Sequence, residues 1–335
     1  MPTSRTRGLR KIKYTEILSS ICAALTLSSL LNATPALACA TCGHMVSNDW
    51  QTQGINTKPG FAVDLSYDYI NQNQMRLGAN KASPADITSF NTATGNPEAE
   101  VLTRNQIVNL GIDYTSVDWG ISLLFPYLDR YHTTNQNGYG VAPLNTSQSA
   151  TLADARVLGR YSGFSGDRSG GLLLGIKLPT GPTDINFADG TPLDRSLQPG
   201  TASTDFIVGG YQTGQINQFG WFVQGTLQHA IATRGDYRPG DTINLTSGIR
   251  YAKFGQQITP MLQLNLVHRE RDSGINALPA YSGGNLVYLS PGLSVRLGDG
   301  TSAYGFVQLP IYQYVNGLQL VPTSTVTVGI RHAFD

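Results

Sequence analysis

The feature that most constrains this chain is a strict alternation of apolar and polar residues over segments of about ten residues. In one segment, alternate positions carry the apolar series Trp119, Ile121, Leu123, Phe125 and Tyr127. A period of two residues places successive side chains on opposite faces of an extended backbone, which is typical of a β-strand. Beyond the N-terminal region we find neither an apolar run of about 18 residues nor a helical stripe. The sequence therefore predicts an all-β fold.

The alternation recurs in about twelve segments. We expect strands at 61–77, 105–116, 119–131, 150–162, 170–180, 203–214, 219–233, 241–253, 258–271, 285–297, 303–314 and 323–334. Their connections run long, short, long, short throughout. Outer-membrane barrels have this asymmetry, because their periplasmic turns are short and their outer loops are long. The pattern predicts a transmembrane antiparallel up-and-down β-barrel of about 12 strands rather than a secreted β-sandwich or a solenoid.

Aromatic residues mark the ends of many segments, at Tyr67, Tyr69, Tyr114, Trp119, Tyr127, Tyr131, Tyr251 and Phe334. In outer-membrane barrels, aromatic girdles lie at both membrane interfaces. The last segment alternates up to Phe334-Asp335, and this end resembles the aromatic-ended terminal strand of bacterial outer-membrane proteins. We therefore expect the protein in the bacterial outer membrane, surrounded by outer-membrane lipid and monomeric.

The N-terminus has the pattern of a secretory signal peptide. A basic region is followed by an apolar stretch at 17–31 and by a small-x-small site at 36–38. This arrangement is typical of a cleaved signal, and a membrane anchor is the alternative. We expect a signal at 1–38, a leader or plug at 39–60, and the barrel at 61–335.

Charge and motifs exclude several function classes. Charged residues make up 13% of the chain, about half of the roughly 25% usual in soluble domains. The formal net charge of +1 does not suggest nucleic-acid binding, which needs a basic stripe. Of the histidines, none lies in a recognisable nucleophile motif, and no phosphate loop or dinucleotide fingerprint is present. We expect no enzymatic activity; a lipase-like hydrolase is the third hypothesis.

If the apolar faces meet lipid, the opposite faces line the lumen. The charged residues on those faces are Asp64, Asp68, Asp113, Asp154, Arg156, Arg160, Lys177, Arg250, Arg269, Arg296 and Arg331. Acids lie mostly on early strands and bases on later ones, which would give a transverse field that favours anions or dipolar solutes. Alternatively, these residues pair with one another and fill the lumen. For 12 strands the sequence leaves both a narrow pore and a filled interior open.

Two further features bear on a pathway. Pro126, Pro291 and Pro310 interrupt strands, where they would mark either bulges at the rims or kinks that open a lateral gap for apolar solutes. The outer loop from 184 to 205 carries four aspartates but lacks a calcium-loop pattern. We expect it to be hydrated and to fold inward to constrict the pore.

The leader carries Cys39, Cys42, His44 and Met45, a C-x-x-C with two further soft ligands. In an oxidising periplasm the plainest outcome is a disulfide between the two cysteines. Sulfur and imidazole ligands also suit Cu(I) or zinc, and lipidation of Cys39 is another alternative. Otherwise we expect no cofactor.

Three phrases resemble a known family. They are Leu178-Pro-Thr-Gly181, Asp189-Gly-Thr-Pro-Leu-Asp-Arg-Ser-Leu-Gln-Pro-Gly-Thr201 and Gln308-Leu-Pro-Ile-Tyr-Gln-Tyr-Val-Asn-Gly317. Together they resemble the bacterial outer-membrane transporters named after the phenol-degradation meta-pathway. This resemblance covers about residues 60–335 and implies transport of small, aromatic or apolar compounds.

Two functional hypotheses follow from the sequence. The first is an outer-membrane channel or transporter that passes small solutes, aromatic or apolar ones included, with the leader and the 184–205 loop narrowing it. The second is a closed barrel that anchors the C-x-x-C leader at the periplasmic face, where it would bind copper or a periplasmic redox or copper-handling partner. Conductance and metal content would separate the two.

Overall fold

Long antiparallel strands dominate the computed structural model, which describes residues 50, 53, 55, 58–164, 166–251 and 257–334. The chain divides into two compact units, residues 1–35 and 36–335, and every described residue belongs to the second. Among the described helices, none has the length and apolar character to cross a membrane.

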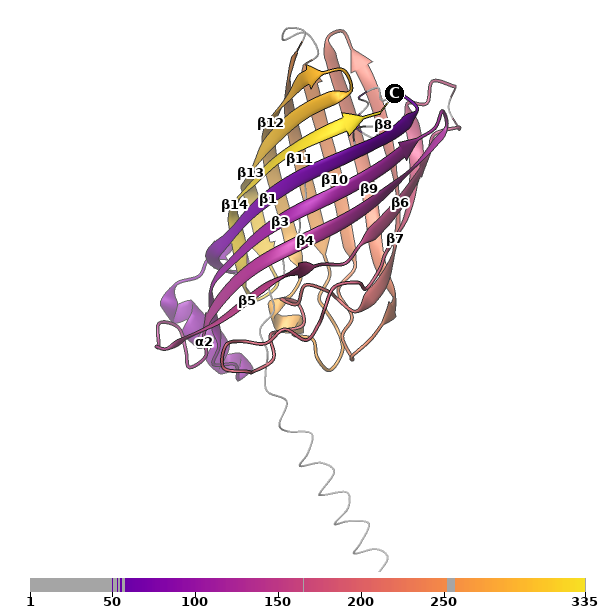
Figure 1. Ribbon diagram of the computed structural model, residues 1–335. Helices are drawn as coiled ribbons and strands as arrows, with labels where there is room; N and C mark the ends of the chain where they lie inside the picture. Colours follow the sequence, from indigo (N-terminus) through magenta and orange to yellow (C-terminus); the bar gives the residue numbers. More distant parts are fainter. Residues whose placement is uncertain are drawn as a thin grey trace, which may run out of the picture. The chain divides into compact units, whose positions relative to one another are not determined.

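The strands form one closed antiparallel sheet (Figure 1). They are β1 (Gly60–Leu77), β2 (Asn80–Lys81), β3 (Ala99–Thr115), β4 (Trp119–Asn135), β5 (Leu144–Leu152), β6 (Arg156–Tyr161), β7 (Gly170–Lys177), β8 (Ser203–Ile216), β9 (Phe219–Thr233), β10 (Thr242–Tyr251), β11 (Ile258–Arg269), β12 (Gly284–Gly298), β13 (Thr301–Val315) and β14 (Leu318–Ala333). Closure comes from β14 pairing with β1, from Ala62 opposite Ala333 to Leu77 opposite Leu318. A closed barrel leaves no free sheet edge at this seam.

The wall has twelve strand positions. Both β5 and β6 pair with β4, along Tyr127–Asn135 and Trp119–Leu124 respectively, so they are one strand interrupted at 153–155. The two-residue β2 pairs only with the end of β1. Of the 14 segments in the sheet, twelve positions remain once β2 is set aside and β5 and β6 are counted as one. The predicted 12-stranded up-and-down barrel is confirmed.

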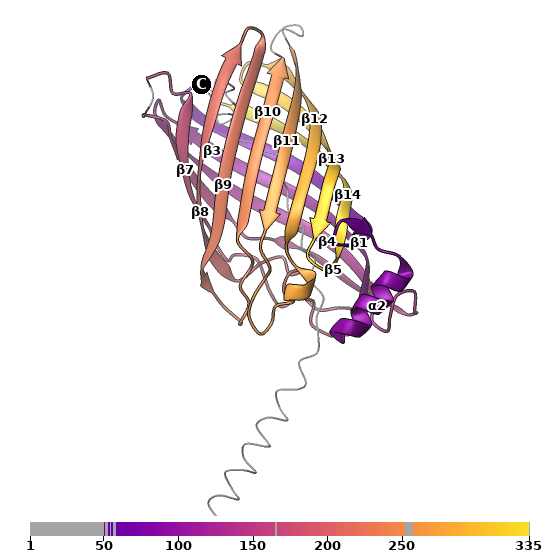
Figure 2. The same ribbon diagram turned by 180° about the vertical axis from the view of Figure 1, so that it is seen from behind.

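The two rims of the barrel differ in their connections. At one rim, which we call the short-turn rim, β8 meets β9 and β12 meets β13 through two residues each. The opposite, long-loop rim carries the segments 78–98, 178–202 and 270–283 (Figure 2). Both ends of the barrel lie at the short-turn rim, where the Phe334 N–H donates to the Phe61 carbonyl over 2.9 Å.

One connection departs from the predicted alternation of lengths. β13 and β14 meet at the long-loop rim through only Asn316 and Gly317, because both strands extend further than expected. Gly317 has φ 75°, and a Cβ there would lie 2.0 Å from the Ala280 carbonyl oxygen. Asn-Gly is a strong signal for a two-residue hairpin turn, since it tolerates positive φ. The Asn316-Gly317 dipeptide is therefore the sequence signal for this short turn.

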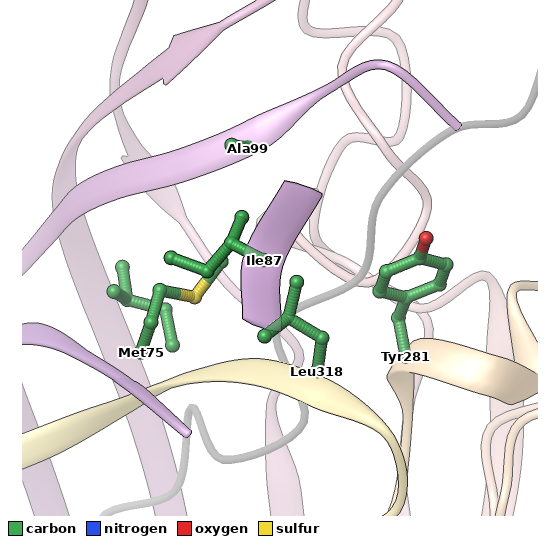
Figure 3. Packing of buried hydrophobic residues seen from close by; sticks show 6 residues of the cluster. Met75, Ile87, Ala99, Tyr281 and Leu318 are labelled. Atoms are coloured by element: carbon green, nitrogen blue, oxygen red, sulfur yellow. The ribbon is translucent and has the colours of Figure 1, made fainter. Parts of the chain in front are cut away.

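The long-loop rim also holds a helix that the sequence pattern did not reveal. Helix α2 (Pro84–Thr94) begins at Ser83, whose hydroxyl accepts from the Asp86 N–H while the Asp86 carboxylate accepts from the Ser83 N–H. This reciprocal capping box, with Pro84 in the first turn, fixes the helix start. Ile87 buries its side chain in a cluster with Met75, Ala99, Tyr281, Leu318 and Leu320 (Figure 3).

Candidate functional site

The register determines which side chains face the lumen. Along β7, Leu172 and Leu174 are about half exposed, whereas Leu173 between them is fully buried. Applied around the barrel, this alternation puts most of the expected charged residues on the inner face: Asp64, Asp68, Asp113, Arg156, Arg160, Lys177, Arg250, Arg269 and Arg331. Asp154 lies in the break between β5 and β6, and Arg296 is exposed near the end of β12.

Near the short-turn rim, inward acids are bound by neighbouring side chains. Arg331 forms an ion pair with Asp113. The Tyr304 hydroxyl donates to Asp64 over 2.8 Å. Asp68 accepts from Thr327 over 2.7 Å. The Arg331 guanidinium thus offsets the charge of Asp113, and the neutral hydroxyls of Tyr304 and Thr327 fix the positions of the Asp64 and Asp68 carboxylates.

An apolar cluster lies in the same half of the lumen. Trp50 is 8% exposed and packs with Met261, Tyr304 and Phe306. Its ring meets the Tyr304 ring edge-on, with centroids 5.5 Å apart, an arrangement that aromatic pairs prefer. Met261 and Tyr304 are each three residues from the start of their strands at the short-turn rim. Trp50, which precedes β1, therefore occupies the lumen at that end.

The other half of the lumen contains a cavity of about 300 Å³. Its apolar lining includes Ile70, Ile107, Leu124, Leu128, Val267 and Leu286. Its charged lining is Arg130, Asp154, Arg156, Lys177, Asp205 and Arg269. Ser196, Gln198, Pro199 and Thr201 close the cavity from the long-loop side, so the 178–202 loop folds inward over it.

Asp154 fixes the base of this loop. Its carboxylate accepts hydrogen bonds from the Gly181 N–H over 3.0 Å and from the Thr201 N–H and hydroxyl over 2.9 and 2.7 Å. Lys177 lies between Asp154 and Asp205, with N–O distances of 3.2 and 2.9 Å, and all three side chains are almost fully buried. Buried charges need such partners to be stable. Because Gly181 and Thr201 lie at opposite ends of the loop, their bonds to Asp154 hold both ends in place.

The loop also completes the interrupted strand. The Thr180 hydroxyl accepts from the Ala155 N–H and donates to the Ala153 carbonyl, each over 2.8 Å. Opposite the break lies Pro126, whose carbonyl accepts from the Ala153 N–H over 2.8 Å. Proline has no N–H for the ladder, so β4 is suited to a partner strand that leaves the sheet here.

The loop is tightly packed at its neck, where Gly181 and Gly200 meet, and at its tip around Leu197. A Cβ on Gly200 would lie 2.1 Å from the Gly181 carbonyl oxygen, so only glycine allows the two ends to approach this closely. At the tip, Leu197 is fully buried with Phe187 and Leu193, and its carbonyl accepts a hydrogen bond from Arg130 of β4. Two of the three phrases that carried the family resemblance, at 178–181 and 189–201, thus form the neck of this loop and its inward turn, and the third, at 308–317, lies on β13 and its turn to β14.

A neighbouring loop braces the same side of the cavity. The guanidinium of Arg195 lies 5.3 Å from the ring centre of Tyr237, and the Tyr237 hydroxyl donates to Asp272 over 2.8 Å. Burial, with the adjacent Asp272 charge, raises the pKa of Tyr237 above its usual value. The phenol therefore stays neutral and acts as a hydrogen-bond donor.

Several functional groups escaped the sequence reasoning, and others lie beyond the structure. Thr180, Thr201, Ser203 and Arg130 were not singled out, because their roles depend on contacts far along the chain; only the family phrases pointed to the first two. Cys39, Cys42, His44 and Met45 lie outside the described residues. Among the described residues, no cluster of three or more His, Cys, Asp or Glu could hold a metal ion.

Comparison with known proteins bears on the fold. No family model matches the sequence, and no curated protein matches it. An outer membrane channel from Pseudomonas putida F1 is structurally similar, with a TM-score of 0.61 and 8% identity over 87% of this chain and 100% of that one. The CymD monoaromatic hydrocarbon channel has a TM-score of 0.46 with 8% identity, covering 90% and 98% of the two chains. The β domain of the Bordetella autotransporter BrkA also scores 0.46, with 13% identity, covering 83% and 100%.

The fold is that of a bacterial outer-membrane β-barrel, and the predicted resemblance to outer-membrane transporters agrees with it. The exterior has the matching chemistry, because apolar side chains such as Leu110, Ile121, Leu245 and Val328 point outward at 39 to 50% exposure. A closed barrel with an apolar outer face is one of the two architectures that can span a bilayer. The fold and the apolar outer face both support the predicted location in the outer membrane.

Proposed function

We propose that this barrel is an outer-membrane channel for small solutes that include aromatic and apolar compounds. The observation that carries the proposal is the cavity beneath the inward loop. Its volume of about 300 Å³ exceeds the roughly 150 Å³ of an engineered apolar cavity that binds benzene. The lining therefore has room for a one-ring molecule, with apolar side chains against which the ring can pack.

The interrupted strand supports a lateral route out of the cavity. Ala153 and Asp154 line the cavity and also form the break in the wall. One edge of β5 pairs with β4, and the other edge faces away from it. Among the described residues, this second edge makes one backbone hydrogen bond, in which the Thr146 carbonyl accepts from the Ala188 N–H. Lipid tails cannot form hydrogen bonds with the backbone N–H and C=O groups of such an edge, so the wall is weakest here. We propose that solutes pass between the cavity and the membrane along this edge.

The leader supplies the closure at the other end in this proposal. Trp50 is bound between Met261, Tyr304 and Phe306 at the short-turn rim, which supports a plug formed by residues 39–59. The apolar cluster would be disrupted by removing that segment. Cu(I) or zinc binding by Cys39, Cys42, His44 and Met45 stays a prediction.

We propose no catalytic role. The most exposed His–Asp pair of the described chain is His229 with Asp241, whose Nδ1–O distance is 2.6 Å. Arg238 donates to the other ring nitrogen over 3.0 Å. A general base needs a free ring nitrogen within reach of a nucleophile, and both nitrogens of His229 are occupied.

Uptake of a radiolabelled one-ring hydrocarbon such as toluene by whole cells tests the proposal. Leu124→Trp would fill the cavity from the inner face of β4, and Leu123→Trp is the matched control because Leu123 points outward. We expect wild type and Leu123→Trp to take up toluene several-fold faster than cells with the empty vector, and Leu124→Trp to fall to the vector rate.

The amount of folded barrel is measured for each variant by heat-modifiable electrophoretic mobility. Equal uptake by the vector and all three folded barrels would refute the proposal.

A further inference from the structure

We propose that the cavity selects small organic anions with an apolar body, and that Arg156 receives their carboxylate. This inference rests on the proposed channel function and names the substrate class of the same cavity. It starts from an asymmetry in the cavity lining, where four cationic side chains face only two carboxylates.

The two carboxylates are already saturated by the protein. Asp154 accepts from Gly181, twice from Thr201 and from Lys177. Asp205 accepts from Ser203 and Gln228 and pairs with Lys177. These donors occupy both carboxylates at hydrogen-bond distance, and among the described residues Lys177 is the cation that forms an ion pair with them.

Arg156 is the fourth cation of the lining, and the other three have partners in the protein, namely Lys177, Arg130 and Arg269. It lies on the inner face of β6, directly opposite Lys177 of β7 and Leu124 of β4. Its side chain is exposed within the lumen. Among the described residues it makes no hydrogen bond and no close ion pair, and Asp205 and Asp154 act on it only as more distant charges. A guanidinium offers five N–H donors in a fork that matches a carboxylate, so Arg156 presents an unused anion-binding group to the cavity.

An apolar surface lies next to that group. Leu124, Pro126 and Leu128 follow one another on the inner face of β4, and Ile107 pairs with Leu128 from β3. All four line the cavity together with Arg156. A one-ring or short-chain carboxylate could bind its head group to Arg156 while its body packs against β4.

The two parts of such a ligand gain from different physics. Burial of the ring contributes in proportion to its apolar area, and the paired N–H donors contribute a charge-assisted interaction about twice as strong as a neutral hydrogen bond. A neutral compound of the same shape obtains only the first. The cavity should therefore prefer benzoate to benzyl alcohol.

Electrophysiology on the full mature barrel tests this preference. We would measure block of small-ion current by benzoate and by benzyl alcohol at pH 7.5, and the benzoate-to-chloride permeability ratio from reversal potentials. Arg156→Gln should weaken benzoate block by about tenfold, the loss expected for a charge-assisted pair, and should leave benzyl alcohol block unchanged.

Arg296→Gln is the matched control, because it removes the same charge from an exposed position near the end of β12 that does not line the cavity. Equal benzoate block in Arg156→Gln, Arg296→Gln and wild type would overturn the inference. In that case the channel would still bind both compounds, but Arg156 would not be the group that receives the carboxylate. Open channels that neither compound blocks would overturn it as well. No current from any barrel, with no toluene uptake, would instead refute the proposed function.

Discussion

At the residue scale, a few buried polar side chains decide whether the lumen is closed by the 178–202 loop. Asp154 binds three donors of the loop and the Lys177 ammonium. Gly181 and Gly200 allow the two ends of the loop to touch. The loop is therefore held by specific interactions at its neck, in addition to the apolar contacts at its tip.

Replacing Asp154 tests the first of these interactions. Asp154→Ala leaves the buried Lys177 with one carboxylate fewer and removes the acceptor for Gly181 and Thr201. Breaking a buried pair from one side costs about 3–5 kcal/mol, so we expect a lower unfolding midpoint in urea and a larger, noisier single-channel current. Asp154→Asn, which keeps one acceptor oxygen of similar position and replaces the other by an NH2 group, should lose less on both measurements. A current identical to wild type in Asp154→Ala would contradict the anchoring role.

Gly200→Ala tests the close approach at the neck. The added Cβ would lie 2.1 Å from the Gly181 carbonyl oxygen, and overpacking of this kind costs about 1–3 kcal/mol. Gly298→Ala is the control, because no heavy atom lies within 4 Å of a Cβ built there. Chemical denaturation should show the loss for Gly200→Ala alone; equal midpoints for both variants would mean that the neck can spread freely.

At the element scale, helix α2 packs against the ends of β1, β3 and β14 at the long-loop rim. The segment after the helix carries Glu98, whose carboxyl is largely enclosed and lies near Asp189 and Thr134. Burial raises the pKa of Glu98 from 4.5 to about 7. Ionisation of this carboxyl therefore works against the folded packing of α2 and β3.

The sign of the pH dependence follows from that shift. Between about pH 4.5 and 7 the folded state binds more protons at Glu98 than the unfolded state does, so stability falls as pH rises through this window. We expect Glu98→Gln to remove this slope and to raise the unfolding free energy above pH 7 by about 1–3 kcal/mol, since one pKa unit corresponds to about 1.4 kcal/mol. Urea unfolding at pH 5 and pH 8 measures it. Equal slopes in wild type and variant would show that Glu98 does not titrate in this range.

The helix start gives a smaller, local effect. Ser83→Ala removes the acceptor for the Asp86 N–H, and loss of a side-chain cap costs about 1 kcal/mol. Hydrogen exchange should accelerate in α2 while the amides of β8–β10 stay protected. Unchanged exchange in α2 would mean that the packing of Ile87 alone sets the helix.

Strands were predictable where one face meets lipid, because lipid contact enforces the alternation. Outside that belt the signal fades, which is why β3 begins at Ala99 and β14 at Leu318, several residues before the predicted starts. The break at 153–155 was hidden because 150–162 alternates through it. The break depends on contacts that are distant along the chain, among them those of Thr180 with Ala153 and Ala155.

At the scale of the whole molecule, closure of the sheet and the sorting of loops followed from the sequence. The cavity did not. It exists because the loop turns inward and binds Arg130 and Asp154, and no local pattern encodes such long-range hydrogen bonds. The lumen is thus divided into an apolar cluster around Trp50 and a cavity with charged and apolar sides.

Single-channel recording of the mature barrel, beside a variant that lacks residues 39–59, tests the central claim most directly. If the barrel is a channel narrowed by its leader, the wild type should show stable openings, and the shortened variant should show larger or noisier ones because the Trp50 cluster is gone. Silence from both forms, with folded barrels verified in the same bilayers, would contradict the account of this molecule as a channel.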